Sequence, residues 1–148
     1  MTVLHSILLV VFFAPLSPLR EQPTSSPERP RFGVCQREGA KIAGEKPTPA
    51  GKVTRAPRKI RDMFPRYPTL PLGTQISAGG VWAGELLLGK DGKVAHVWTI
   101  REIRFTPPFP AFNESIVAAL RQWEFEPLVV DSRAVPACMT VTMNIDWQ

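Results

Sequence analysis

The stretch Asn113–Pro127 limits the possible folds most strongly, because its hydrophobic period changes within a few residues. Asn113 is a predicted helix cap. Apolar side chains then recur at helical spacing, which predicts one apolar helix face formed by Ile116, Leu120 and Trp123. Trp123 and Phe125 are two positions apart, as in a strand, and Pro127 cannot continue a helix. A helix that leads directly into a strand is therefore predicted here.

Residues 80–100 are predicted to form a β-hairpin. Two apolar runs flank Asp91-Gly92, a dipeptide that favours a type I′ turn with positive φ at both central residues. With Leu88 opposite Lys93, the core face would pair Leu86 with Ala95, Gly84 with Val97 and Trp82 with Thr99. Glu85 and His96 would pair on the other face. Trp98 would lie near Ala83 on that face, as either a binding residue or a cover over another part of the domain. Gly84 inside a strand indicates a bulge or the close approach of another backbone.

The C-terminal part of the sequence is predicted to form two strands. Leu128–Val130 continues the strand that begins at Trp123, Asp131–Arg133 makes a turn, and Val135–Trp147 alternates apolar and polar side chains. The predicted fold class is α+β: a small two-layer antiparallel sheet, formed by the hairpin and the two C-terminal strands, with one helix packed on one face. The long last strand has no proline after Pro136, so its edge is the predicted site for an added peptide strand.

The first 58 residues differ in composition from the rest. Within residues 1–19 the apolar run Ile7–Ala14 is shorter than the roughly 20 residues of a spanning helix, which favours a secretory signal peptide; a truncated membrane anchor is the alternative. Residues 20–58 are rich in proline and basic residues, and a disordered linker or tail is predicted there. Residues 59–148 are the predicted domain.

Positive charge is concentrated in one part of the sequence. Residues 20–66 contain 12 Lys and Arg against 5 Asp and Glu, whereas residues 67–148 contain 6 against 8. The basic stretch has no aromatic residue between Arg37 and Arg61, so it lacks the stacking platforms of single-strand nucleic-acid binders. Nucleic acid is therefore not an expected partner.

The residues that could perform chemistry are few and scattered. Two free thiols are favoured over a bridge, because Cys35 lies in the predicted tail and Cys138 in a predicted strand. His5 and His96 cannot form a metal cluster, and the sequence lacks a nucleophile elbow, a phosphate-binding loop and a dinucleotide fingerprint. Glu124 and Glu126 alternate with Trp123 and Phe125, as on a solvated strand face. No enzymatic activity, cofactor or metal is expected.

These segments together resemble a known family. The run Ile116–Pro127, the turn after it and the strand Val135–Ile145 are similar to the C-terminal domain of TonB-family energy transducers. Upstream, Pro65-Arg-Tyr-Pro68, Gly80-Val81, Glu85 and Asp91–Val94 follow the same pattern in the same order. The similarity covers roughly residues 55–147. In this chain Pro71 and Gly73 lie where the family commonly has a short helix, so that helix is expected to be lost or shortened.

The resemblance implies a non-enzymatic, periplasmic protein-binding module, exported or anchored in the inner membrane. Such domains add a short peptide of an outer-membrane TonB-dependent transporter to their last strand and transmit force, in association with inner-membrane proton-channel subunits. By residue match, the protein-binding residues would be an entry motif and an edge strand, namely Pro65, Tyr67 and Pro68, and Met139, Thr140, Val141, Thr142, Met143, Asn144 and Ile145.

The same sequence features are compatible with two alternative functions. The chain could be a secreted structural or dimerising envelope module, with the last strand paired to the same strand of a second copy and no role in energy transduction. It could also bind an envelope surface or nucleic acid through the basic residues 20–58, in which case binding would weaken steeply with salt.

Overall fold

The computed structural model describes residues 31–147 except 54, 68 and 71. Two α-helices, a 3₁₀ turn and nine strands are present in these residues. In chain order they are α1 (Val34–Ala43), β1 (Thr48–Pro49), η1 (Ala50–Lys52), β2 (Lys59–Arg61), β3 (Ser77–Leu88), β4 (Val94–Arg101), β5 (Arg104–Thr106), α2 (Pro110–Leu120), β6 (Glu124–Phe125), β7 (Leu128–Val130), β8 (Arg133–Val135) and β9 (Ala137–Trp147).

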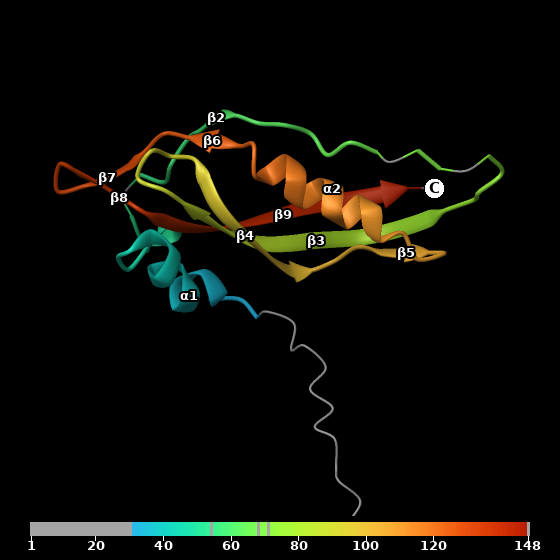
Figure 1. Ribbon diagram of the computed structural model, residues 1–148, viewed down its shortest axis with the longest axis horizontal. Helices are drawn as coiled ribbons and strands as arrows, with labels where there is room; N and C mark the ends of the chain where they lie inside the picture. Colours follow the sequence, from blue (N-terminus) through green and yellow to red (C-terminus); the bar gives the residue numbers. More distant parts are fainter. Residues whose placement is uncertain (1–30, 54, 68, 71, 148) are drawn as a thin grey trace, which may run out of the picture.

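The long strand β3 is the centre of the main sheet (Figure 1). β9 pairs antiparallel with it over its whole length, from Ala78↔Trp147 to Leu88↔Ala137. On the other edge, β4 and β5 pair with successive parts of β3. β1 adds a short parallel pair beyond the start of β9, and β2–β6 and β7–β8 form two separate ribbons. The predicted α+β class is confirmed.

The main core lies between α2 and one face of this sheet. Because side chains alternate along a strand, Trp82, Leu86 and Leu88 point to the same face of β3. They are fully or almost fully buried together with Ile116 and Leu120 of α2. The predicted helix face is thus confirmed for these two residues, whereas Trp123 is only partly buried at the margin of the core.

The predicted hairpin exists, but its register differs. Leu88 pairs with Val94, Leu86 with Val97 and Gly84 with Thr99, while Glu85 lies opposite Trp98. The difference arises from irregularities between Leu87 and Leu88 and between Ala83 and Gly84. The bulge predicted at Gly84 is therefore confirmed. An added Cβ there would overlap the indole ring of Trp82 and lie 2.8 Å from the carbonyl oxygen of Trp98.

The turn of that hairpin also differs from the type I′ turn that was predicted. Only Gly92 has a positive φ, whereas Asp91 does not. The N–H of Gly92 donates to the carbonyl of Gly89, and Asp91 accepts a hydrogen bond from the N–H of Lys93 through Oδ1. The aspartate therefore caps a longer loop. Two consecutive positive φ values occur instead at Asp131 and Ser132, in the turn predicted between β7 and β8.

α2 begins one turn earlier than predicted, and Asn113 is not its cap. Phe109 occupies the cap position and Pro110 the first turn, where a missing N–H has no cost. Asn113 is buried, and its side chain pairs with the backbone of Ile103, accepting from the N–H and donating to the carbonyl, both at 3.1 Å. Asn113 therefore fixes the segment after β4 against α2.

The predicted disordered tail is wrong for residues 34–52, because α1, β1 and η1 pack onto the domain. Cys35 and Cys138 form a disulfide with Cα atoms 5.9 Å apart, which contradicts the favoured reading of two free thiols. The bonded cysteines and Leu87 form a second small core on the sheet face opposite α2. Trp98 is half-buried and packs against this cluster, so it covers part of the second core. Residues 1–30, including the predicted signal peptide, lie outside the described part.

No helix forms in the described residues between 62 and 76, as the loss of the family's short helix predicts. Within the described part of the chain, no helix has both the length and the apolar character needed to cross a membrane.

Candidate functional site

The outer edge of β9 is the candidate site. β1 covers this edge at Ala137 and Cys138, and no other strand pairs with it among the described residues. Beyond Cys138, therefore, the edge has no strand partner in that part of the chain. Unpaired edge groups are a template for pairing with another chain.

The identity of the exposed backbone groups follows from one hydrogen bond. The N–H of Thr48 donates to the carbonyl of Pro136 at 2.9 Å, so the carbonyl of residue 136 points away from β3. Alternate residues of a strand direct these groups to opposite sides, and the β3–β9 pairing has no register shift. Thr140, Thr142 and Asn144 consequently direct their N–H and C=O groups outward.

The side chains of the edge alternate in the same way. Thr140, Thr142 and Asn144 are exposed on the face opposite α2, whereas Met139, Met143 and Ile145 are half-buried against the main core, and Val141 is 9% exposed. The polar side chains keep the edge soluble, while the apolar ones fix its position.

A groove of about 420 Å³ lies at the start of this edge. Its walls come from α1, from the segment around η1, and from β3 and β9. The lining residues are Gln36, Pro49, Ala50, Gly51, Ala56, Glu85, Cys138, Met139 and Thr140. The amide nitrogen of Gln36 is buried without a hydrogen-bond partner among the described residues. The walls formed by α1 and η1 were not predicted from the sequence, because residues 20–58 were expected to be a disordered linker.

The carboxylate of Glu85 in this groove positions α1. It accepts hydrogen bonds from the N–H of Gly33 and from the N–H of Cys35 at 2.8 Å. These are two of the backbone donors that a helix leaves unsatisfied at its N-terminus, where a negative charge is also favoured by the helix dipole. Glu85 is therefore a capping residue supplied by the sheet.

The predicted entry motif is only partly described and lies on α2. Pro65 is half-buried, Tyr67 is 64% exposed with its ring stacked on Phe112 at 5.1 Å between centroids, and Pro68 lies outside the described residues. The structure thus brings the seven predicted β9 residues together in one continuous edge, and it places Pro65 and Tyr67 in a separate segment.

Three basic residues at and beside β2 form ion pairs within the domain. Arg58 Nη2 lies 2.5 Å from Glu126 Oε1, Arg61 Nη1 lies 3.4 Å from Glu124 Oε1, and Lys59 pairs with Asp62. The hydrogen bond from Arg58 lowers the pKa of Glu126 below its usual value. The Arg58–Glu126 and Arg61–Glu124 contacts join the segment of β2 to that of β6.

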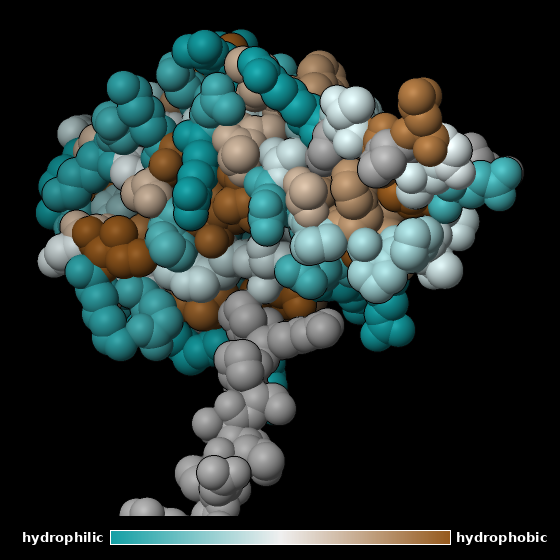
Figure 2. Space-filling model, turned by 45° about the vertical axis from the view of Figure 1, so that its right-hand side comes forward, coloured by the Kyte–Doolittle hydropathy of each residue, from teal (hydrophilic) through white to brown (hydrophobic). Residues whose placement is uncertain are grey.

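On the face drawn in Figure 2, hydrophobic side chains lie in small groups between hydrophilic ones. No group of three or more His, Cys, Asp or Glu side chains is placed to bind a metal ion in the described part of the chain. A comparison with models of known protein families and with curated protein sequences finds no match to this chain.

Proposed function

We propose that this protein is a periplasmic module that binds an extended peptide as an added strand on the outer edge of β9, in the manner of the TonB C-terminal domains it resembles. The supporting observation is the run of outward backbone groups at Thr140, Thr142 and Asn144, which lacks a strand partner within the described residues. Strand addition uses main-chain hydrogen bonds for affinity and alternate side chains for specificity. The proposed partner is a peptide of an outer-membrane TonB-dependent transporter.

The disulfide supports a location outside the cytoplasm. Disulfides persist in oxidising compartments such as the bacterial periplasm and are rare in the cytosol. The Cys35–Cys138 bond joins two segments of the folded domain with both sulfurs buried, as structural bridges do. Export of the chain is therefore part of the proposal.

The test removes one outward donor without touching the β3 ladder. Thr142→Pro removes the N–H that points away from β3, a position at which an edge strand tolerates proline; Thr142→Val is the control that keeps this N–H. The oxidised protein is titrated with a transporter peptide while amide chemical shifts are recorded. We expect shifts at residues 140–145 in the wild type and the valine variant, and at least a tenfold loss of affinity in the proline variant.

A second variant protects the test against misfolding. Asn144→Pro removes the next outward donor, and the melting temperature of each variant is compared with that of the wild type. Unchanged binding by two folded proline variants, or peptide shifts confined to residues away from β9, would rule the proposal out.

The same edge supports a second candidate, a homodimer in which β9 pairs with β9 of another copy. Two identical edges can pair about a twofold axis. Sedimentation at several protein concentrations separates the two: the dimer requires a mass that rises with concentration and returns to the monomer in Thr142→Pro.

A further inference from the structure

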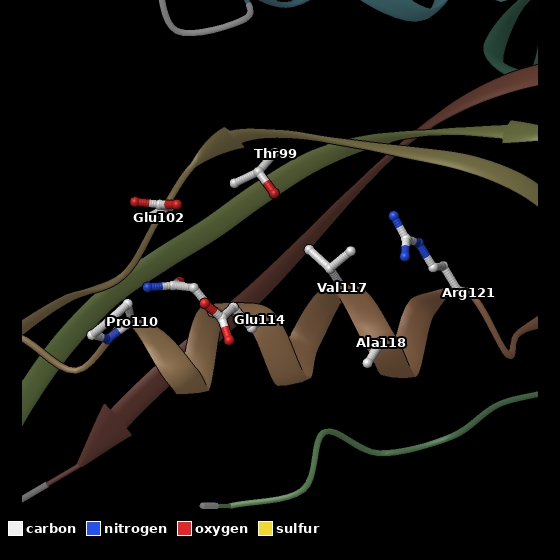
Figure 3. Close-up of a pocket in the computed structure, with 8 residues that line it drawn as sticks. Thr99, Glu102, Pro110, Glu114, Val117, Ala118 and Arg121 are labelled. Atoms are coloured by element: carbon white, nitrogen blue, oxygen red, sulfur yellow. The ribbon is translucent and has the colours of Figure 1, made fainter. Parts of the chain in front are cut away.

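A second groove lies on the opposite side of the sheet, between α2 and β4. It has a volume of about 330 Å³ and is lined by Thr99, Glu102, Pro110, Asn113, Glu114, Val117, Ala118 and Arg121. In Figure 3, Val117 and Arg121 project from the helix toward the strand, while Thr99 lies on the strand above them. One wall is thus a helix and the other is a strand.

That strand is the other edge of the main sheet. β4 pairs with β3, and within the described residues no strand pairs with its outer side apart from the isolated bridge Lys93↔Glu124 at its beginning. On β9 the residues at even positions from 136 point their polar backbone groups outward, so the odd-numbered residues bond to β3. Because β3 pairs with β9 without a register shift, Glu85 and Leu87, which lie opposite even-numbered β9 residues, direct their polar backbone groups to β4. Their partners Trp98 and His96 point inward, and Val97 and Thr99 therefore point their N–H and C=O groups outward.

The groove carries opposite charges at its two ends. Glu102 and Glu114 lie at the end where α2 begins, and Arg121 lies at the end where it finishes. All three side chains are exposed, and none forms an ion pair with another described residue. The half-buried Val117 lies between the two ends. A ligand with separated positive and negative groups would complement this arrangement.

The dimensions match an extended peptide. The helix positions from Pro110 to Arg121 span about 16 Å at about 1.5 Å per residue. Two peptide residues four positions apart share one strand face and lie about 13 Å apart. A cation and an anion at this spacing would reach the two ends of the groove together. Antiparallel addition to β4 places the N-terminal side of the peptide at the acidic end.

We propose that the groove between α2 and β4 binds an extended peptide antiparallel to β4, with Lys or Arg near Glu102 and Glu114 and with Asp or Glu four residues later near Arg121. Val97 and Thr99 supply the main-chain hydrogen bonds. The residue midway between the two charges is on the same strand face as they are, and an apolar side chain there lies over Val117. This site is independent of the β9 edge, from which β3 and β4 separate it.

The test uses capped pentapeptides and the oxidised full chain. Acetyl-Lys-Thr-Val-Thr-Glu-amide has no terminal charges; the controls are the reversed peptide, acetyl-Glu-Thr-Val-Thr-Lys-amide, and a peptide with Gln at both ends. We expect amide shifts at Val97, Thr99 and along α2, with about fivefold tighter binding than either control, as two exposed ion pairs provide. High salt should reduce this difference.

Charge reversal of the groove supplies the decisive variant. The double substitution Glu114→Lys and Arg121→Glu changes two exposed side chains, so the fold should be retained, and it should make the protein prefer the reversed peptide. Thr142→Pro, on the distant edge, should leave pentapeptide binding unchanged. Equal binding of the Gln peptide, no binding at millimolar peptide, or shifts only at β9 would overturn the groove site, and equal binding of the reversed peptide would overturn its orientation.

Discussion

Gly84 lets the indole ring of Trp82 lie across β3. At the scale of residues, this glycine therefore determines how the core packs. A Cβ at position 84 would overlap that ring and approach the carbonyl oxygen of Trp98 to 2.8 Å. We expect Gly84→Ala to lower the free energy of unfolding by about 1–3 kcal/mol, as overpacking does. Urea denaturation measures this. Gly79→Ala is the matched control in the same strand, because no heavy atom lies within 4 Å of its added Cβ; equal effects of both substitutions would contradict the interpretation.

The stabilising contribution of the Arg58–Glu126 pair should depend on pH. A hydrogen bond from Arg58 is the largest cause that lowers the pKa of Glu126 below its usual value. Because the folded pKa lies below the unfolded one, the stabilising contribution is complete above the unfolded pKa and is lost as pH falls through the folded pKa. We expect Arg58→Ala to raise the Glu126 pKa, as measured by NMR titration of its carboxyl carbon.

The control for this titration is Arg55→Ala. Arg55 Nη2 lies 3.9 Å from the other oxygen of Glu126 and is largely exposed, so its removal should move the pKa less. A Glu126 that titrates alike in the wild type and in Arg58→Ala would show that the pair does not persist in solution.

At the scale of elements, α1 depends on contacts far away in sequence. Its N-terminal N–H groups donate to Glu85, and Gly39 lets it approach the sheet, since a Cβ there would lie 2.9 Å from Pro47 Cγ and 3.3 Å from Leu87 Cδ1. We expect Glu85→Ala to destabilise the docked helix by about 1–2 kcal/mol. Amide hydrogen exchange of residues 34–43 should then become faster in reductant. Glu38→Ala, which removes only an exposed pair with Lys41, should leave the exchange unchanged.

The same element shows why part of the fold could not be predicted from the sequence. α2, the turn at Asp131-Ser132 and the long last strand have local signals, namely helical spacing, turn residues and alternation, and they were found. α1 has no side-chain N-cap of its own, and its cap is a carboxylate 50 positions away in β3. Asn113 misled for the same reason, because its amide pairs with Ile103 and not with its own helix.

The candidate site was likewise predictable from the sequence only in part. The edge of β9 was predictable from the length and alternation of one segment. The groove at its start was not, since Pro49, Ala50 and Gly51 come next to Met139 and Thr140 only through the packing of η1 and α1. The register of β4 was missed because bulges leave no clear signal apart from Gly84.

At the scale of the whole molecule, the disulfide closes a loop of 103 residues. A cross-link of this span removes conformational freedom from the unfolded chain and is worth about 4–5 kcal/mol in the chain-entropy treatment. We expect the double variant Cys35→Ala and Cys138→Ala to unfold at a lower denaturant concentration, with a free energy of unfolding reduced by about 4–5 kcal/mol. The control is the wild type in reductant, which should match it. A double variant as stable as the oxidised wild type would mean that the bridge adds nothing.

This closed loop has a mechanical consequence. A tension applied between the chain before Cys35 and the end of β9 would pass from Cys35 to Cys138 through the two sulfur atoms, and residues 36–137 would bear none of the load. The domain would lengthen only by peeling β9 from β3 at its far end. Reduction would add about 350 Å of chain that can extend between the two points of force. The redox state of this one bond therefore decides how far the molecule can lengthen under tension.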